Sequence, residues 1–212
     1  KLPPLVLPAG SGRSVEVIGR IDRVDAEETD DGLLLRIIDY KSSAQALRLE
    51  DVVFGLTLQL LTYMDALLTH APAWLGKPAD PAGVLYFHVH DPLIPSPVPL
   101  PADEARRLTL REYKTRGLLT ADELIVRMMD RQLDTGRSEL VPAGITKGGA
   151  FYSGSAVVTR DEWSVLRGAV RRMIERIGQR ILDGEVAIAP YRLGDRSPCA
   201  FCPYKPVCHF DP

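Results

Sequence analysis

The chain contains 212 residues, and 45% of them are apolar, so it is long enough to bury the core of one domain. Its net charge of −2 excludes a protein that is basic over its whole surface, so any contact with nucleic acid must come from local patches. No apolar run reaches the roughly 18 residues of a membrane span, and no signal-peptide pattern is present. We therefore expect no membrane partner and a cytoplasmic location. The start at Lys1 rather than Met suggests a fragment or a processed piece.

The first 41 residues favour β-strands. A short apolar run at 5–7, with prolines around it, fits an edge strand. Two further strands are expected at 15–25 and 33–41, on either side of a polar turn at 26–32. The Asp-Asp-Gly sequence at the end of this turn favours antiparallel pairing of the two strands.

This pairing would bring charged side chains together. It can place Asp22 near Asp39, and Lys41 shares a face with Asp39 because side chains two apart on a strand point the same way. Two carboxylates and a lysine at one strand end suit a divalent metal ion and the anion that it polarises. The alternative is a solvated hairpin surface with an ordinary ion pair.

A long helix is predicted over 47–70, where apolar residues recur at helical spacing. Gly55, Gln59 and Tyr63 lie four residues apart on it and form one stripe, which could lie against the two strands. The alternative is that Gln59 and Tyr63 are ordinary polar residues of an amphipathic helix.

A proline-rich loop at 71–81 should lead into a third core strand at 83–90. His88 and His90 would face one side of this strand, either as metal ligands or as satisfied polar residues. A second proline-rich connection follows at 91–101.

The second half of the chain is predicted to be helical and rich in loops. The segment 104–117 is short and basic, and a helix over 120–133 would have Thr120 as its N-cap with Glu123 three residues later. The Gly-rich segment 144–155 predicts a mobile or hairpin loop. It lacks the GxxxxGK[ST] pattern, so we expect no ATP site.

The last long helix should begin at a Thr159 cap and end near Leu182, before Gly184. One face of this helix is apolar and another is rich in arginine. The apolar face comprises Leu166, Val170, Met173, Ile174, Ile177 and Ile181, and the arginines are Arg167, Arg171, Arg172, Arg176 and Arg180.

All three cysteines, Cys199, Cys202 and Cys208, lie close to the C-terminus. Their odd number and close spacing favour a soft metal or an iron–sulfur cluster over a disulfide. Either group needs four ligands, and His209 directly beside Cys208 would be an awkward fourth, although zinc stays open. The alternative is three free buried thiols.

Taken in order, these motifs resemble the PD-(D/E)XK nuclease superfamily in its RecB-like form. The motifs are Asp22, then Asp39-Tyr40-Lys41, then Gln59-x-x-x-Tyr63. The CxxCPYxxxC tail with its trailing Phe210-Asp211 is similar to the tail of the AddB-type nuclease domains of bacterial helicase–nucleases. The resemblance covers nearly the whole chain.

The resemblance implies an α/β fold with a restriction-endonuclease-like core, a mixed sheet flanked by helices. The core would occupy 1–95, and a helical and loop-rich extension at 96–212 would return the cysteines to it within one structural domain. Such a domain hydrolyses phosphodiester bonds in DNA, degrading the 5′-ended strand during double-strand-break repair. Its partners would be DNA and a helicase–nuclease subunit of the AddA type.

The resemblance also assigns roles to residues. Asp22, Asp39 and the backbone carbonyl of Tyr40 would hold Mg²⁺ or Mn²⁺, Lys41 would orient the attacking water, and Gln59 with Tyr63 would position DNA or support the metal ligands. Candidate phosphate contacts are Arg106, Arg107, Arg111, Lys114 and Arg171, although a solvated helix face explains arginines equally well. Cys199, Cys202 and Cys208 would ligate a 4Fe–4S cluster.

Two features of the family are missing from the sequence. The family's core begins with a helix that supplies a further metal ligand, and nothing before Leu5 can form it. The fourth cysteine of the cluster, expected upstream, is also absent. We therefore expect weak or no nuclease activity from these residues alone. A second hypothesis is a non-catalytic, metal-stabilised module that binds DNA or docks a helicase, but intact Asp22, Asp39 and Lys41 argue against it.

Overall fold

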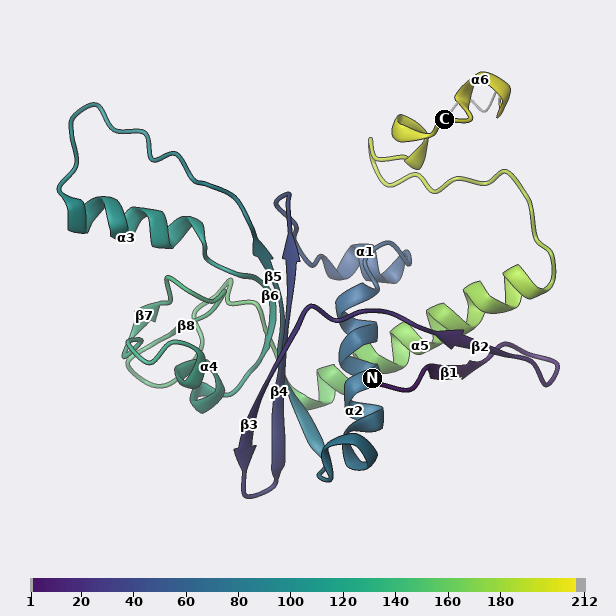
Figure 1. Cartoon of the computed structure of the whole chain (residues 1–212), viewed down its shortest axis with the longest axis horizontal. Helices are drawn as coiled ribbons and strands as arrows, with labels where there is room; N and C mark the ends of the chain where they lie inside the picture. The colour runs from purple at the N-terminus through teal and green to yellow at the C-terminus, as the bar shows by residue number, and fades with distance from the viewer. Residues whose placement is uncertain (1, 209–212) are drawn as a thin grey trace.

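The computed structural model describes residues 2–208 (Figure 1). At its centre is a five-stranded sheet with the order β3-β4-β5-β6-β9. The strands are β3 (Arg23–Thr29), β4 (Gly32–Lys41), β5 (Ala79–His88), β6 (Arg116–Thr120) and β9 (Val157–Val158). β3 pairs antiparallel with β4, β4 runs parallel to β5, β5 pairs antiparallel with β6, and β6 runs parallel to β9. The expected mixed sheet flanked by helices is therefore confirmed, and strands from both halves of the chain share it.

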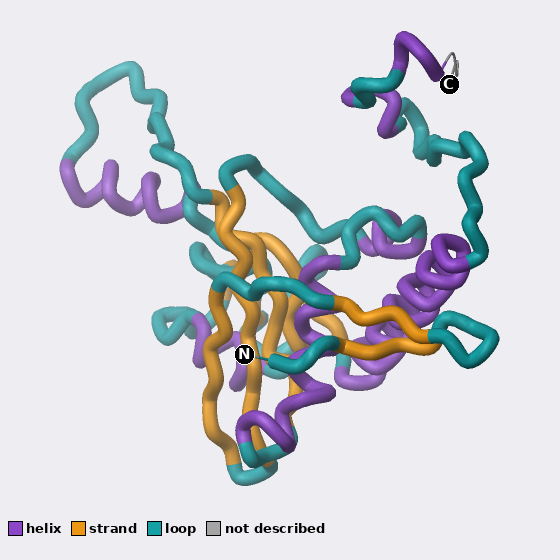
Figure 2. Tube along the Cα trace, turned by 45° about the vertical axis from the view of Figure 1, so that its right-hand side comes forward, coloured by secondary structure: helices purple, strands orange, loops and turns teal. Residues whose placement is uncertain are grey.

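The prediction of one continuous strand over 15–25 is wrong. Its first part, β2 (Ser14–Val17), pairs with β1 (Leu5–Pro8) in a separate hairpin that lies along the last long helix (Figure 2). The backbone is irregular until β3 begins at Arg23, because the segment crosses from one sheet to the other. The turn after β3 is also shorter than predicted, since Thr29 already pairs with Gly32.

The predicted helix over 47–70 is two helices, α1 (Leu49–Val53) and α2 (Gln59–Leu75). The break occurs where Gly55 has a φ of +76°, a left-handed conformation that ends α1. Gly55 therefore does not lie on a helical stripe with Gln59 and Tyr63. α2 continues through Pro72 and ends at Gly76, so the loop expected from residue 71 begins later.

The two longest helices cover one face of the sheet. α2 and α5 (Arg160–Leu182) pack there on a core that includes Leu35, Ile37, Met64 and Trp163. The predicted cap of α5 is confirmed, because Thr159 and Glu162 exchange hydrogen bonds in a capping box. This packing places α2, which carries Gln59 and Tyr63, directly beside β4 and β5.

The opposite face of the sheet has its own core, covered by α4 (Glu123–Met129) and by the small sheet of β7 (Gly136–Arg137) and β8 (Gly144–Ile145). The Gly-rich segment forms a hairpin-like turn, in which Ile145 is fully buried and bridges to Phe151.

The prediction that Thr120 is the N-cap of a helix is wrong. Thr120 is the buried last residue of β6, where its hydroxyl donates to the Pro81 carbonyl and accepts a 2.7 Å hydrogen bond from Trp163. The real cap of α4 is Asp122, whose side chain accepts from the Leu124 N–H. The basic segment is also helical, as α3 (Ala102–Glu112).

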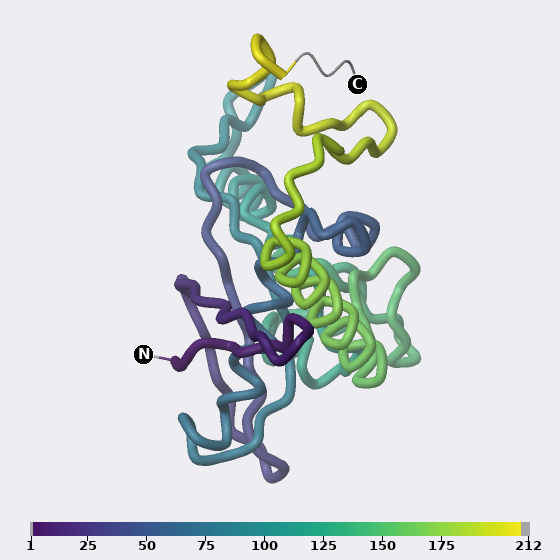
Figure 3. The backbone as a smooth tube through the Cα atoms, turned by 90° about the vertical axis from the view of Figure 1, so that its right-hand side faces the viewer, coloured from purple at the N-terminus to yellow at the C-terminus, as the bar shows by residue number. Residues whose placement is uncertain are grey.

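The C-terminal tail, yellow in Figure 3, continues from α5. It carries two short helices, η1 (Pro198–Phe201) and α6 (Lys205–Cys208). Arg196 connects the tail to α1, because it donates hydrogen bonds of 2.6 and 3.2 Å to the carboxylate of Asp51. This bond lowers the pKa of Asp51. Within residues 2–208, no helix combines the length and the apolar character that a membrane crossing requires.

Candidate active site

The carboxylates predicted to act together lie at the end of β4. Asp39 is buried, with 2% of its surface exposed, and it faces the α2 side of the sheet. The β3–β4 register pairs Arg23 with Ile38, so Asp22 lies level with the end of β4. There the Asp22 carboxylate accepts a 3.1 Å hydrogen bond from the backbone N–H of Tyr40. The structure therefore brings both aspartates to the same strand end.

Lys41 is held between β4 and α2. Its Nζ lies 2.6 Å from Asp39 Oδ2 and donates a 2.9 Å hydrogen bond to Gln59 Oε1. Gln59 in turn donates from its Nε2 to the Tyr63 hydroxyl at 3.1 Å. The contacts run in one line from Asp39 through Lys41 and Gln59 to Tyr63, so the position of the ammonium is fixed from two elements.

Tyr86 also belongs to this site, and sequence reasoning missed it. It lies opposite Asp39 in the parallel β4–β5 pair, and its ring centre is 5.7 Å from Lys41 Nζ. Burial and the neighbouring Asp39 charge raise the pKa of Tyr86 to about 12, so the phenol stays protonated at neutral pH. The sequence around Tyr86 is apolar and contains no motif that marks a functional residue. Only the register between β4 and β5 shows that Tyr86 lies opposite Asp39.

The donor set at this strand end fits one hard divalent cation. Asp39 Oδ2 is buried and, apart from the close ammonium, has no hydrogen-bond partner among the described residues, so it retains a lone pair for a metal ion. Asp22 is exposed and brings a second carboxylate. In the described part of the chain, no group of three or more His, Cys, Asp or Glu side chains is arranged around a common point. Mg²⁺ commonly uses only one or two carboxylates and keeps several waters, which agrees with this sparse set.

Gly19 lies in the segment between β2 and β3 and allows this segment to approach α2 closely. A Cβ at Gly19 would lie 2.7 Å from Cε1 of Tyr63, closer than real Cβ contacts. A Gly19→Ala variant should therefore displace the Tyr63 ring and break its hydrogen bond with Gln59. We expect the free energy of unfolding to fall by about 1–3 kcal/mol, because an extra methyl group in a tight contact forces its neighbours to shift. Thermal unfolding followed by circular dichroism measures the effect.

Gly148→Ala is the matched control for this prediction, since a Cβ at Gly148 meets no atom within 4 Å and φ is not positive there. Equal stability of the two alanine variants would show that Gly19 is not in close contact with Tyr63.

The two histidines of the third predicted strand stack on each other. Their ring centres are 4.0 Å apart, and His90 Nδ1 lies 3.1 Å from the carbonyl of His88. Neither belongs to a metal-binding group among residues 2–208. The geometry therefore favours the interpretation that His88 and His90 are satisfied polar residues rather than metal ligands.

Three of the five candidate phosphate contacts bind other protein groups. Arg111 pairs with Glu139 at 2.5 Å, and Lys114 donates to the Ser138 carbonyl at 2.7 Å. Burial lowers the pKa of Lys114. The other two candidates, Arg106 and Arg107, are exposed on α3.

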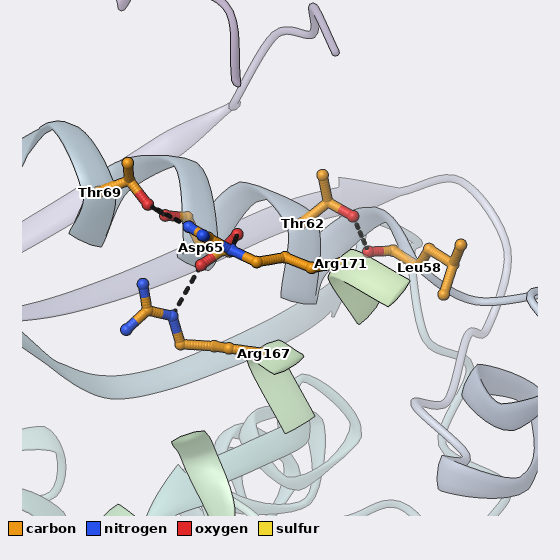
Figure 4. A network of polar contacts seen from close by, with 6 residues as sticks. All are labelled: Leu58, Thr62, Asp65, Thr69, Arg167 and Arg171. Atoms are coloured by element: carbon orange, nitrogen blue, oxygen red, sulfur yellow. Dashed lines mark hydrogen bonds and ion pairs between the residues drawn. The ribbon is translucent and has the colours of Figure 1, made fainter. Parts of the chain in front are cut away.

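Arg171 is the third engaged candidate, and its partner lies in α2. Asp65 is fully buried and accepts hydrogen bonds of 2.8 Å from Arg167 and 2.6 Å from Arg171 (Figure 4). Arg171 also donates to Thr69. These two arginines join α5 to α2 through one buried carboxylate.

The three cysteines are half-buried in the tail and form no disulfide. They lie in or beside η1 and α6, but they do not converge into a metal-binding group among the described residues. His209 and Phe210-Asp211, which the sequence motifs of this tail include, lie outside the described residues.

Comparison with known proteins agrees with the motifs. The PD-(D/E)XK nuclease superfamily matches residues 4–209 of the chain. Over 99% of its length, the chain is 49% identical to the B-type subunit of an ATP-dependent helicase/deoxyribonuclease from Bacillus pumilus. Proteins of the same name from Bacillus subtilis and Geobacillus thermodenitrificans are 48% and 49% identical. The chain spans 18% of the length of each of these relatives.

Proposed function

Because the chain belongs to the PD-(D/E)XK nuclease superfamily, we propose that it is a DNA nuclease that hydrolyses phosphodiester bonds with Mg²⁺ or Mn²⁺. The observation that carries this proposal is the line of contacts from buried Asp39 through Lys41 to Gln59, with Asp22 at the same strand end. Carboxylates and a fixed ammonium at the carboxyl ends of parallel strands suit a phosphate group and its counter-ion.

Asp22, Asp39 and the backbone carbonyl of Tyr40 would hold the metal ion. When bound, the ion would polarise the phosphate and lower the pKa of a coordinated water. Lys41 supplies a positive charge that is already positioned, so it orients the attacking water and offsets the negative charge that builds on the phosphate. Gln59, supported by Tyr63, would hold the Lys41 ammonium in this position. The neutral ring of Tyr86 lies beside the ammonium.

Binding of Mn²⁺ tests the metal site without relying on turnover. An Asp39→Asn variant should bind Mn²⁺ at least about tenfold more weakly in calorimetry or electron paramagnetic resonance, since it loses a charged hard ligand. Asp80→Asn, an exposed aspartate at the start of β5, is the control and should leave binding unchanged. Equal Mn²⁺ affinity for the wild type and Asp39→Asn would contradict the assignment.

We propose further that Cys199, Cys202 and Cys208 supply three ligands of a 4Fe–4S cluster, as the similarity of the tail to AddB-type domains implies. The same similarity implies that the fourth ligand is a cysteine upstream of these three. We expect a longer polypeptide that extends upstream, purified without oxygen, to contain iron and sulfide and to absorb broadly in the visible range. A Cys202→Ser variant should lose most of the iron. Zinc in place of iron would contradict the proposal.

The names of the relatives support a wider role. Their shared name describes one subunit of an ATP-dependent helicase/deoxyribonuclease, an assembly that acts on DNA. We propose that the chain works next to a second subunit of the AddA type and degrades the 5′-ended strand as an exonuclease in double-strand-break repair. A duplex labelled separately at each 5′ and 3′ end would report the strand that is degraded.

A further inference from the structure

A hollow of about 430 Å³ lies on the face of the sheet opposite α2, between the strands and α3. It lies outside the line of contacts around Lys41. Its wall combines aromatic rings with arginine and aliphatic groups, namely Arg23, Tyr40, Phe87, Leu110, Tyr113 and Thr115.

The aromatic rings form a preorganised platform. The rings of Phe87 and Tyr113 are nearly parallel, at 5° with centres 5.8 Å apart, and Tyr40 meets Phe87 edge-on at 5.8 Å. The Tyr113 hydroxyl donates a 3.1 Å hydrogen bond to the carbonyl of His90, which fixes the ring. Tyr40 is 42% exposed. Rings that are already ordered lose little entropy when a flat ligand stacks on them.

The rim of the hollow is positively charged. Arg23 and Arg36 both pair with the single carboxylate of Asp25, so this trio keeps one net positive charge. Across the hollow, residues 106–116 contain five arginines and lysines and one acidic residue, Glu112. Arg111 is paired with Glu139, while Arg106 and Arg107 stay exposed. A polyanion that carries flat rings suits this combination better than an apolar peptide does.

The hollow also has a defined position relative to the catalytic side chains. Tyr40 lies between Asp39 and Lys41 in β4, and successive side chains on a strand point to opposite faces. A strand of DNA that passes around the carboxyl ends of β4 and β5 would therefore meet Lys41 on one face and the aromatic platform on the other.

We propose that this hollow binds an unpaired base of single-stranded DNA, which stacks on the rings of Tyr113 and Phe87 while the arginines contact the neighbouring phosphates. The link to a scissile phosphate at Asp39 and Lys41 rests on the proposed nuclease function. The binding of the base does not.

The test measures the affinity for a fluorescent oligothymidylate by anisotropy, with EDTA present so that no cleavage occurs. The wild type should bind this probe more tightly than an abasic strand of equal length. A Tyr113→Leu variant should bind the oligothymidylate about tenfold more weakly, since stacking on an aromatic ring contributes about 1–3 kcal/mol per base. Its affinity for the abasic strand should change little.

Two further variants keep the test decisive. Tyr113→Phe keeps the ring but loses the hydrogen bond to His90, so it should bind the oligothymidylate more tightly than Tyr113→Leu does. Tyr152→Leu, which removes an exposed ring that does not line the hollow, should have no effect. Equal affinities for the oligothymidylate and the abasic strand, or unchanged binding by Tyr113→Leu, would overturn the proposal and leave the surface to a protein partner. Loss of cleavage in Lys41→Ala with unchanged binding would separate the catalytic proposal from this one.

Discussion

A Lys41→Ala variant should cleave DNA about 100- to 1,000-fold more slowly than the wild type, the usual cost of removing one charge-stabilising donor from an active site. Within residues 2–208, its ammonium is the only cation that forms an ion pair with Asp39, at 2.6 Å, and Gln59 fixes it from α2. Its removal therefore leaves Asp39 without an ion-pair partner among these residues. Affinity for DNA should be nearly unchanged, because phosphate contacts elsewhere on the surface remain.

The measurement uses excess protein over end-labelled DNA with Mn²⁺, so that even a slow reaction can be followed. Lys77→Ala is the matched control, since Lys77 pairs with Glu28 at the opposite end of the same strands. It should cleave like the wild type. Equal cleavage by Lys41→Ala would contradict the proposed catalytic role of Lys41. DNA binding without cleavage by the wild type would favour the non-catalytic module.

An Asp65→Ala variant should lower the free energy of unfolding by about 2–3 kcal/mol. Removing one partner of a fully buried ion pair typically costs about 3–5 kcal/mol, because the remaining charge is left without a partner in the interior. The cost should be lower here, since the Arg167 and Arg171 side chains are 32% and 36% exposed and can reach water. For a chain of this size, the melting temperature should fall by about 4–12 °C.

Thermal unfolding followed by circular dichroism gives the melting temperature. The control is Glu28→Ala, which removes a surface ion pair with Lys77 and should change stability by less than about 1 kcal/mol. Equal shifts for the two variants would show that the Asp65 clamp does not join α5 to α2. Cleavage should also slow in Asp65→Ala, because α2 carries Gln59 and Tyr63.

The order of the motifs in the sequence was enough to identify the superfamily. Strand alternation placed Asp39 and Lys41 on one face, and the turn after β3 brought Asp22 to the same end. The cap of α5 was equally local, since Thr159 and Glu162 lie three residues apart. These features depend on residues close in sequence, where backbone geometry leaves few alternatives.

The sequence misled where the backbone conformation depends on distant contacts. Gly55 fits a helical pattern, yet it takes a left-handed conformation next to Met173 of α5 and ends α1. Thr120 resembles an N-cap, yet Trp163 and Pro81 make it the buried end of a strand. Tertiary packing overrides local preference in both cases.

Residue types in a fixed local order were sufficient to predict the fold class and the family and to propose the catalytic candidates. The contacts of Tyr86 with Lys41 and of Arg167 and Arg171 with Asp65 became visible only in the tertiary structure. The same is true of the hollow shared by Tyr40, Phe87 and Tyr113. These groups are far apart in the chain. Their proximity follows from the parallel β4–β5 register and from helix packing, and neither can be read from residue spacing.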